Sequence, residues 1–238
     1  MKKNNKEKLI AFIPARGGSK RFPKKNIASF MKSPLISYPI KEALKSKIFS
    51  DVIVSSDDDK IIKIAKKYGA LTVLRSKKNS SDIAHELEAC REYFSILTKN
   101  KLSLPNFFCL IYPTAVLIKS KDFKNSYKLI KNSSEVDVVM GVSTFNYHPY
   151  KALIQNKNGF LTPIFKKKYS KISQTYESMY ASNGTFYWHR TKSFLDKKYL
   201  GHYAKNLIGY KINSEISMDI DFKKDLDNLN AFFRFKKK

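Results

Sequence analysis

The chain has 238 residues, 42% of them apolar, which suits one folded domain with a sizeable core, or one domain with an appendage. Its 46 basic against 20 acidic residues give a formal net charge of +26, so a nucleic-acid-binding protein is a hypothesis to test. The lysines are spread along the whole chain and arginine, which dominates specific base reading, is scarce beside lysine, both of which weigh against that class.

Strand and helix patterns alternate through the first half of the chain. Strands are predicted at Leu9–Pro14, Asp51–Ser55, Leu71–Leu74, Phe107–Tyr112 and Val136–Val142. Helices are predicted from the Ser33 N-cap to about Lys47, from Asp57–Asp59 to Gly69, from Asp82 to about Thr98, and near Lys121–Lys131. Pro39 falls inside the first of these helices and should bend it. The alternation predicts a mainly parallel sheet with helices on both faces, a three-layer α/β fold.

The second half of the chain is less regular. Tyr150–Gln155 reads as a strand that ends at an Asn-Lys-Asn-Gly turn, and the residues from Phe160 to Tyr180 show weak periodicity and many cations. We expect an excursion from the sheet at about 145–185 within a single domain covering residues 1–238, and interpret it as a dimerisation arm. After an Asn183-Gly184 turn, the chain is predicted to form strands at Phe186–Arg190 and Leu207–Ile212, then a closing helix at Lys223–Phe233.

The cysteines and the start of the chain bear on its location. Cys90 and Cys109 are isolated and have no metal-like spacing, so we interpret them as small buried hydrophobes in a reducing compartment. The apolar stretch after the basic residues Met1–Lys8 is too short for a signal peptide and runs straight into Arg16. No apolar run approaches membrane-spanning length. We therefore expect a cytoplasmic protein with no membrane partner.

The most informative stretch is the loop that follows the first strand. It contains two adjacent glycines and five basic residues: Arg16, Gly17, Gly18, Lys20, Arg21, Lys24 and Lys25. Glycine lets a backbone approach a ligand closely, and exposed N–H groups beside cations suit a polyphosphate. Ligands of open α/β sheets bind where strands end. The spacing is neither that of the P-loop nor G-x-G-x-x-G. The loop predicts a polyphosphate site, with a merely solvated basic turn as the alternative.

An acidic pair near the carboxyl end is the second candidate. Asp219 and Asp221 stand at i and i+2, so an extended segment would point both carboxylates to one side. Two such oxygen ligands suit Mg²⁺, which binds through one or two carboxylates and the substrate's phosphates. Asp221 could also cap the last helix, whereas Asp219 has no such role. With the loop holding a triphosphate, the pair predicts metal-assisted nucleotidyl transfer.

Other polar residues have less specific patterns. His85 and Glu86 lie on the long helix and could be surface residues, while capping explains Asp57–Asp59 more simply than metal binding. His148 lies in a loop after a strand end, where a functional and a structural role carry equal weight. For the aromatic run Phe186–Trp188, core packing is favoured for at least two of the three residues.

Several segments resemble one known family, the acylneuraminate cytidylyltransferases, also called CMP-sialic acid synthetases. IPARGGSKRFPKKN resembles the family's first signature, and SMDIDFKKDL resembles its carboxy-terminal S-x-D-I-D metal motif. VIVSSDDDKIIKIAKKYGA is similar to the second strand and helix, Tyr112-Pro113-Thr114-Ala115 stands where many members have Q-P-T-S, and NGTFYW is similar to a later N-G-x-x-Y segment. The resemblance covers nearly the whole chain and implies a Rossmann-like nucleotide-diphospho-sugar transferase fold.

The resemblance implies transfer of CMP from CTP to the anomeric hydroxyl of a nine-carbon 2-keto acid sugar, releasing pyrophosphate and giving an activated sugar for surface glycans or flagellin. It implies Lys25, Arg16 and Asp219 as catalytic residues, and Asp219 and Asp221 as ligands of Mg²⁺. The residues implied for CTP are Ala15, Arg16, Gly17, Gly18, Ser19, Lys20, Lys25, Asn26 and Arg75, the last near the cytosine. A homodimer is also implied, in which the excursion reaches the partner.

Departures from the family pattern concern the sugar. Tyr112 replaces a glutamine that contacts the sugar, and Glu86 stands near where a serine approaches the base. Lys171 and Gln174 lie where the family often has an arginine followed by Q-D, which makes Lys171 a candidate for the sugar carboxylate. The residues implied for the sugar are Tyr112, His148, Lys171, Gln174 and Tyr187.

These features resemble most the pseudaminic acid cytidylyltransferase branch, whose sugar has a more apolar tail that suits a ring in place of an amide. The alternatives are a CMP-N-acetylneuraminate or CMP-legionaminate synthetase and, in another class, a basic nucleic-acid-binding protein. The last would lack any helix-turn-helix, zinc or RNP signature.

Overall fold

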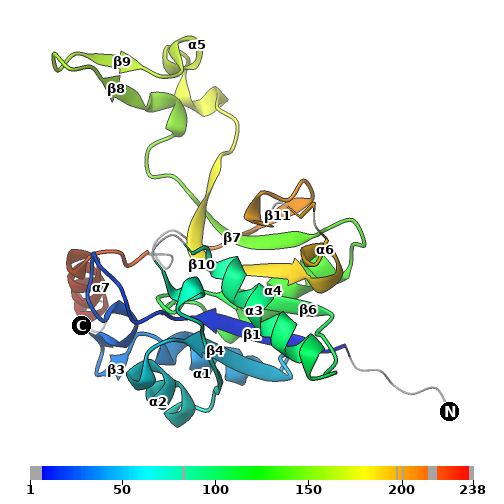
Figure 1. Ribbon diagram of the computed structural model, residues 1–238. Helices are drawn as coiled ribbons and strands as arrows, with labels where there is room; N and C mark the ends of the chain where they lie inside the picture. Colours follow the sequence, from blue (N-terminus) through cyan, green and yellow to red (C-terminus); the bar gives the residue numbers. More distant parts are fainter. Residues whose placement is uncertain (1–6, 82–83, 197, 200, 214–218, 236–238) are drawn as a thin grey trace.

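The computed structural model of the chain describes residues 7–81, 84–196, 198–199, 201–213 and 219–235. Its centre is a seven-stranded sheet in the order β11-β7-β10-β6-β1-β4-β5 (Figure 1). The strands span Leu9–Pro14 (β1), Asp51–Ser56 (β4), Leu71–Leu74 (β5), Phe107–Ile111 (β6), Val138–Thr144 (β7), Tyr180–Arg190 (β10) and Leu207–Lys211 (β11). Only β10 runs antiparallel to its neighbours, β6 and β7, in this sheet. The predicted mainly parallel sheet is confirmed.

Helices cover both faces of the sheet, as the alternating pattern predicted. The helices are α1 (Ser37–Ser46), α2 (Asp59–Lys67), α3 (Glu86–Lys99), α4 (Ser120–Lys131), α5 (Lys166–Tyr169), α6 (Thr191–Phe194) and α7 (Lys223–Phe235). In β1, Leu9, Ala11 and Ile13 pack in one core cluster with residues of α1, α2 and α4. Ile10 and Phe12 point the other way and pack with residues of α3 and α6. Every residue of β1 is buried, as a central parallel strand requires.

Helix α7 covers a smaller third cluster at one end of the sheet. Leu226 and Leu229 of this helix pack against Phe30 and Leu35. Those two residues belong to the segment around a small hairpin, β2 (Ser29–Phe30) and β3 (Ser33–Pro34). The packing brings the carboxyl end of the chain next to the segment that follows the basic loop.

One of the predicted helix starts was wrong, and a second falls outside the described residues. Ser33 lies in β3 and does not cap α1, which begins at Ser37. Pro39 is therefore the third residue of α1, where a missing N–H loses no intrahelical bond, and the predicted bend has no cause. Helix α3 begins at Glu86, with the His85 side chain accepting a hydrogen bond from the Leu87 N–H, while the predicted start at Asp82 lies outside the described residues.

The predicted boundaries of α2 were right. The Asp58 carboxylate accepts hydrogen bonds from the N–H groups of Lys60 and Ile61, at 2.7 and 3.1 Å. This side chain satisfies two of the donors that every helix start leaves open. Gly69, with a φ of +89°, follows the end of the helix.

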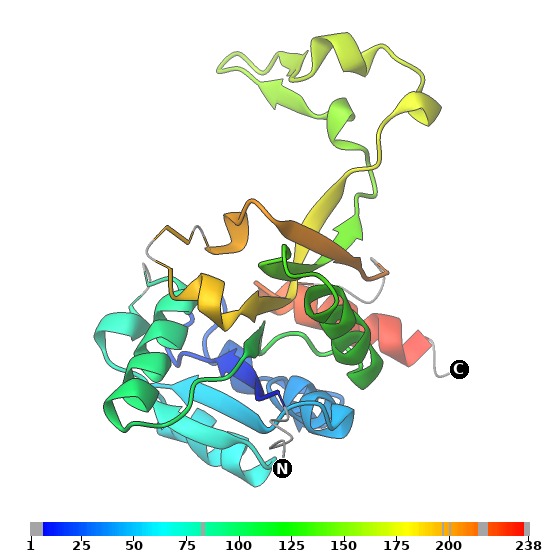
Figure 2. The same ribbon diagram turned by 90° about the vertical axis from the view of Figure 1, so that its right-hand side faces the viewer.

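The expected excursion leaves the sheet between β7 and β10. Figures 1 and 2 show it projecting well away from the rest of the molecule. It contains a hairpin of β8 (Leu153–Gln155) and β9 (Leu161–Pro163), followed by α5. The predicted strand is shorter than expected because Pro149–Lys151 forms a 3-10 turn, whereas the Asn156–Gly159 turn is present with Gly159 at a φ of +84°.

Within the described part of the chain, no helix combines the length and apolarity that a membrane span requires.

Candidate functional site

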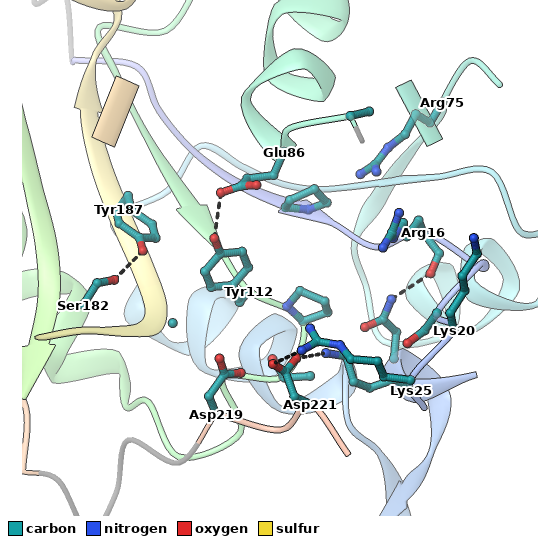
Figure 3. A pocket seen from close by; sticks show the side chains of 18 residues that line it. Arg16, Lys20, Lys25, Arg75, Glu86, Tyr112, Ser182, Tyr187, Asp219 and Asp221 are labelled. Atoms are coloured by element: carbon teal, nitrogen blue, oxygen red, sulfur yellow. Dashed lines mark hydrogen bonds and ion pairs between the residues drawn. The ribbon is translucent and has the colours of Figure 1, made fainter. Parts of the chain in front are cut away.

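A cavity of about 560 Å³ opens at the carboxyl ends of β1, β5 and β6. Its lining joins segments from both ends of the chain: Pro14, Arg16, Ser19, Lys20, Arg21, Lys25, Asn26, Arg75, Ala84, Glu86, Tyr112, Pro113, Thr114, Ser182, Gly184, Tyr187, Asp219 and Asp221. Ligands of open α/β sheets bind in this position. Figure 3 shows the basic side chains on one side of the cavity and Tyr187 with Ser182 on the other.

The basic loop is held against the start of α2 by its first glycine. The Gly17 N–H donates to Asp57 Oδ1 at 2.9 Å. A Cβ on Gly17 would lie 2.8 Å from Asp58 Cβ, so no larger residue fits unless the backbone moves. A Cβ on Gly18, by contrast, would meet no atom within 4 Å. The close packing of the loop against the start of α2 thus depends on Gly17 and not on Gly18.

Asn26 closes the loop from the other side. Its side chain is buried and Nδ2 donates to the Arg16 carbonyl at 2.9 Å, which fixes the two ends of the loop to each other. Lys24, just before it, has a left-handed backbone with a φ of +56° and turns the chain into the 3-10 turn Lys25–Ile27. The loop therefore presents its cations from an ordered backbone.

The acidic pair meets the loop although the two lie 196 residues apart in sequence. Asp221 binds Arg21 Nη1 at 2.9 Å through Oδ2 and Lys25 Nζ at 3.1 Å through Oδ1. The alternative role of Asp221 as a helix cap is not what the structure shows. Asp225 Oδ2 instead accepts the Asp221 and Phe222 N–H groups at the start of α7, at 2.9 and 2.7 Å.

Asp219 lies beside a bulge in β10. The register of β10 with β7 shifts between Ser182 and Tyr187, so the predicted Asn183-Gly184 turn is an irregularity inside one long strand. Gly184 has a φ of +62° and a Cβ there would lie 3.2 Å from Asp219 Oδ2. Burial and the neighbouring Asp221 carboxylate raise the pKa of Asp219. Two close carboxylates of this kind are a donor set that suits a hard cation such as Mg²⁺.

Arg75 lies deep at the base of the cavity. Its guanidinium is buried and donates from Nη2 to the Ser55 carbonyl at 3.1 Å and from Nε to Ser55 Oγ at 3.3 Å. These bonds fix the side chain to the end of β4. Burial lowers the pKa of Arg75. Arg75 thus lines the cavity in a fixed position beside the end of β4.

A hydrogen-bonded group around Glu86 is the main feature that sequence reasoning missed. Glu86 Oε1 accepts from Tyr112 Oη at 2.7 Å and lies 3.0 Å from His202 Nε2. Burial raises the pKa of Glu86, whereas the hydrogen bonds from His202 and Tyr112 lower it. The net result is a pKa of about 2. Burial and the Glu86 charge raise the pKa of Tyr112. Nothing in the sequence around His202 signals this contact, because it forms only in the folded chain.

The same group was tested as a metal centre. Donor atoms of His85, Glu86 and His202 all lie within 4.8 Å of one another. However, His85 Nδ1 already accepts the Leu87 N–H, and His202 Nε2 is within hydrogen-bond distance of Glu86 Oε1. The group is therefore held together without a metal, and we interpret it as a hydrogen-bonded network.

The cavity collects most, but not all, of the residues predicted for the site. Those that line it are Arg16, Ser19, Lys20, Lys25, Asn26, Arg75, Tyr112, Tyr187, Asp219 and Asp221. Ala15 is buried and continues the β1 pairing by donating its N–H to the Ser55 carbonyl. Gly17 and Gly18 line a neighbouring cavity of about 390 Å³ with Ser19 and Lys20.

Three residues predicted for the sugar lie outside the cavity of their own chain. His148, Lys171 and Gln174 belong to the projecting excursion. His148 Nε2 lies 2.9 Å from the Glu177 carbonyl, and Nδ1 accepts the Tyr150 N–H at 3.2 Å, so this ring holds the base of the excursion together. Lys171 and Gln174 are exposed. As the aromatic run predicted, Phe186 and Trp188 are fully buried in the core, while Tyr187 lines the cavity.

A family model described as Cytidylyltransferase matches residues 10–236. A pseudaminic acid cytidylyltransferase of Campylobacter jejuni subsp. jejuni is 34% identical over 229 residues, which are 95% of this chain and 97% of the relative. An N-acylneuraminate cytidylyltransferase of Escherichia coli is 30% identical over 92% of this chain and 51% of its own length.

Solved structures share the fold. A CMP:2-keto-3-deoxy-manno-octonic acid synthetase complexed with CTP superposes with a TM-score of 0.72 at 14% identity, covering 96% of this chain and 99% of that protein. A cytidylyltransferase of Leptospira borgpetersenii has a TM-score of 0.61 at 16% identity, covering 96% of this chain and 87% of that protein. At these identities the likeness speaks for the fold, which is the Rossmann-like α/β fold that the sequence predicted.

Proposed function

The chain belongs to the cytidylyltransferase family, and we propose that it transfers CMP from CTP to the anomeric hydroxyl of a nonulosonic acid, with release of pyrophosphate. The observation that carries the proposal is the meeting of the basic loop and the acidic pair, through Lys25 and Asp221, at the end of the parallel strands. Neither group alone would specify nucleotidyl transfer.

In this proposal, positively charged side chains of the chain itself supply most of the catalysis. Arg16, Lys20 and Lys25 lie along one side of the cavity, where they would offset the negative charge of the triphosphate. Phosphoryl transfer needs little covalent chemistry from a protein, so positioned charges supply most of the catalysis. Arg75, held at the base of the cavity, would fix the nucleotide at its other end.

Asp219 and Asp221 would hold Mg²⁺, which when bound neutralises charge on the phosphates. The fit rests on two observations. Burial and the neighbouring Asp221 charge raise the pKa of Asp219, so its ionised form is disfavoured unless a cation lies beside it. Gly184 leaves space for the Asp219 carboxylate where any side chain would crowd it.

We propose pseudaminic acid as the sugar. The Campylobacter relative, which covers nearly the whole chain, carries that activity in its name. Tyr112 and Tyr187 present two rings to the cavity, 5.8 Å apart and nearly perpendicular, which suits a sugar with an apolar tail. N-acetylneuraminate and legionaminate are the alternative sugars, and the Escherichia coli relative supports the first of them.

A pyrophosphate-release assay with CTP, Mg²⁺ and each of the three sugars tests the proposal. We expect turnover that requires Mg²⁺, prefers pseudaminic acid and falls sharply in Asp219→Ala. Asp227→Ala, which removes an exposed carboxylate on α7, is the matched control and should keep wild-type turnover. A clear preference for N-acetylneuraminate would refute the choice of sugar, and no CTP-dependent release with any sugar would refute the reaction.

We also propose a homodimer in which the excursion reaches the partner's cavity. The support is that the excursion exposes large apolar side chains, among them Ile154, Phe160, Leu161, Ile164 and Ile172. Exposed apolar area of this kind marks interaction sites. Light scattering should give twice the chain mass for the wild type and the monomer mass for a Phe160→Ser, Ile172→Ser double variant. A monomeric wild type would refute this arrangement.

A cytoplasmic location is proposed as well. Cys90 and Cys109 are free thiols, both fully buried, and burial raises the pKa of each. Unbridged cysteines are usual in a reducing compartment.

A further inference from the structure

Glu86 differs from Asp221, another carboxylate of the cavity, in how its charge is balanced. Asp221 is bound by Arg21 and Lys25. In the described residues, by contrast, the basic neighbours within 4 Å of the Glu86 carboxylate are two histidines and no lysine or arginine. A carboxylate in a cavity suited to phosphates repels the ligand unless it meets a hydrogen-bond donor on it.

The two oxygens of Glu86 have different surroundings. Oε1 receives Tyr112 Oη at 2.7 Å and His202 Nε2 at 3.0 Å. Because an ionised carboxylate only accepts, the network assigns the proton of His202 to Nε2. Oε2 lies 3.6 Å from His85 Nδ1, but that nitrogen accepts the Leu87 N–H and so carries no proton to donate. None of the described side chains donates to Oε2, and the further bond to the carboxylate comes from the Glu86 N–H of the backbone. Each carboxylate oxygen has two lone pairs, so Oε2 can still accept from a ligand in the cavity that Glu86 lines.

The carboxylate is held in place before any ligand arrives. The His202 ring stacks on Tyr187 with ring centroids 3.8 Å apart. Gly201 has a φ of +67°, and a Cβ there would lie 2.9 Å from Leu87 Cδ1, so the turn that carries His202 packs closely against α3. Groups that are fixed by their neighbours in this way discriminate between ligands better than mobile ones.

The charge state of Glu86 decides what it can bind. Its pKa of about 2 keeps the carboxyl ionised at neutral pH, so it accepts hydrogen bonds and cannot donate them. Phosphate oxygens and the carboxylate of an acid sugar are acceptors and are repelled. A hydroxyl both donates and accepts hydrogen bonds, so an ionised carboxylate would neither exclude it nor select it strongly. An N–H group donates only and so matches the acceptor Oε2.

We propose that Glu86 is a specificity-determining residue whose carboxylate oxygen Oε2 accepts a hydrogen bond from an N–H group of a substrate. This inference rests on the proposed function. Two groups of that reaction have this chemistry: the exocyclic amine of cytosine, and the amide N–H of an N-acylated sugar. Uracil carries a carbonyl oxygen where cytosine has its amine, which Glu86 would repel.

Glu86→Gln tests the proposal because it keeps the shape and the acceptor for Tyr112 but places an NH₂ donor or a neutral oxygen where Oε2 was. Glu88→Gln is the matched control. It makes the same charge change on the same helix, at a residue that pairs with Arg91 outside the cavity. For each protein, the binding of CTP and UTP is measured by calorimetry without sugar. The kcat/KM is then measured for CTP, UTP, the N-acylated sugar and an analogue with hydroxyls in place of its acylamino groups.

Loss of one charge-assisted hydrogen bond predicts a fall of about 10- to 100-fold for the substrate that Glu86 contacts. If that is cytosine, Glu86→Gln weakens CTP binding and lowers the CTP-to-UTP ratio. If it is the sugar, CTP binding is unchanged, KM for the N-acylated sugar rises, and its advantage over the hydroxyl analogue shrinks. If Glu86 has a merely structural role, kcat/KM falls by the same factor for all substrates and both ratios stay unchanged.

The proposal is overturned if both ratios in Glu86→Gln equal those of Glu88→Gln. Failure of the proposed function gives a different result, because the wild type itself would then release no pyrophosphate from CTP. The nucleotide-binding comparison still reports on the cytosine arm in that case.

Discussion

Replacing Lys25 with alanine should separate activity from stability. Lys25 Nζ lies 3.1 Å from Asp221 Oδ1, and the two side chains are 18% and 32% exposed. Ion pairs in contact with solvent contribute at most about 1 kcal/mol. Asp221 also keeps Arg21 at 2.9 Å in the variant. Because about 1 kcal/mol corresponds to about 2–4 °C in a chain of this size, the midpoint of thermal unfolding should fall by no more than about 4 °C.

The expected loss of activity is much larger. A unit charge about 4 Å from a phosphate oxygen interacts by about 4 kcal/mol at an effective dielectric constant of about 20. Removing one such preorganised group typically lowers kcat by about 100- to 1,000-fold. Pyrophosphate release measured for wild type, Lys25→Ala and the control Lys45→Ala, which removes an exposed lysine of α1, checks this. Wild-type turnover in Lys25→Ala would refute its role at the phosphates, and loss of folding would show that the ion pair is structural.

Three further outcomes follow from the contacts described above. Gly184→Ala should lower the free energy of unfolding by about 1–2 kcal/mol, because alanine is strained at a φ of +62°. It should also lower kcat at least tenfold, because the added Cβ would crowd Asp219. Unchanged kinetics would contradict this expectation. Trp188→Phe removes the 2.9 Å hydrogen bond to Ser126 and leaves a cavity, so chemical denaturation should show a loss of about 2–4 kcal/mol with kcat unchanged. The folded-state pKa of Glu86 is depressed from 4.5 to about 2, so its contribution to stability is present above pH 4.5 and is lost as the pH falls toward 2. The stability difference between wild type and Glu86→Gln should therefore shrink over that range, and a constant difference would contradict the assignment.

The fold could be predicted closely because its signals are local. The apolar run of β1, the Asp58 cap and the Gly69 stop of α2 act over a few residues, and each is present where the sequence placed it. The start of α1 was missed because Ser33 and Pro34 form a helix-start pattern but pair with Ser29–Phe30 in a hairpin. In that case tertiary pairing overrode the local signal.

The candidate site was predictable where its residues form motifs and not where they meet by folding. The loop cations and the acidic pair could be found because their spacing along the chain carries the chemistry. His202 could not be found, since a lone histidine forms no motif with its neighbours in sequence, and it meets Glu86 where Gly201 lies close to Leu87 in the folded chain. The sequence could not show that His148, Lys171 and Gln174 lie far from the cavity, because this depends on how the fold projects their segment away from the sheet.

The sequence by itself determined the strand–helix alternation, the glycine-containing basic loop and the carboxylate pair, since each depends on residues that are close along the chain. Only the tertiary structure decided that Asp221 binds Lys25 across 196 residues, that Asn183-Gly184 is a bulge beside Asp219, and that Glu86 bonds Tyr112 and His202 through one oxygen. These depend on strand register and on loops that meet at one sheet edge. Long-range packing sets both, and no spacing in the sequence records them.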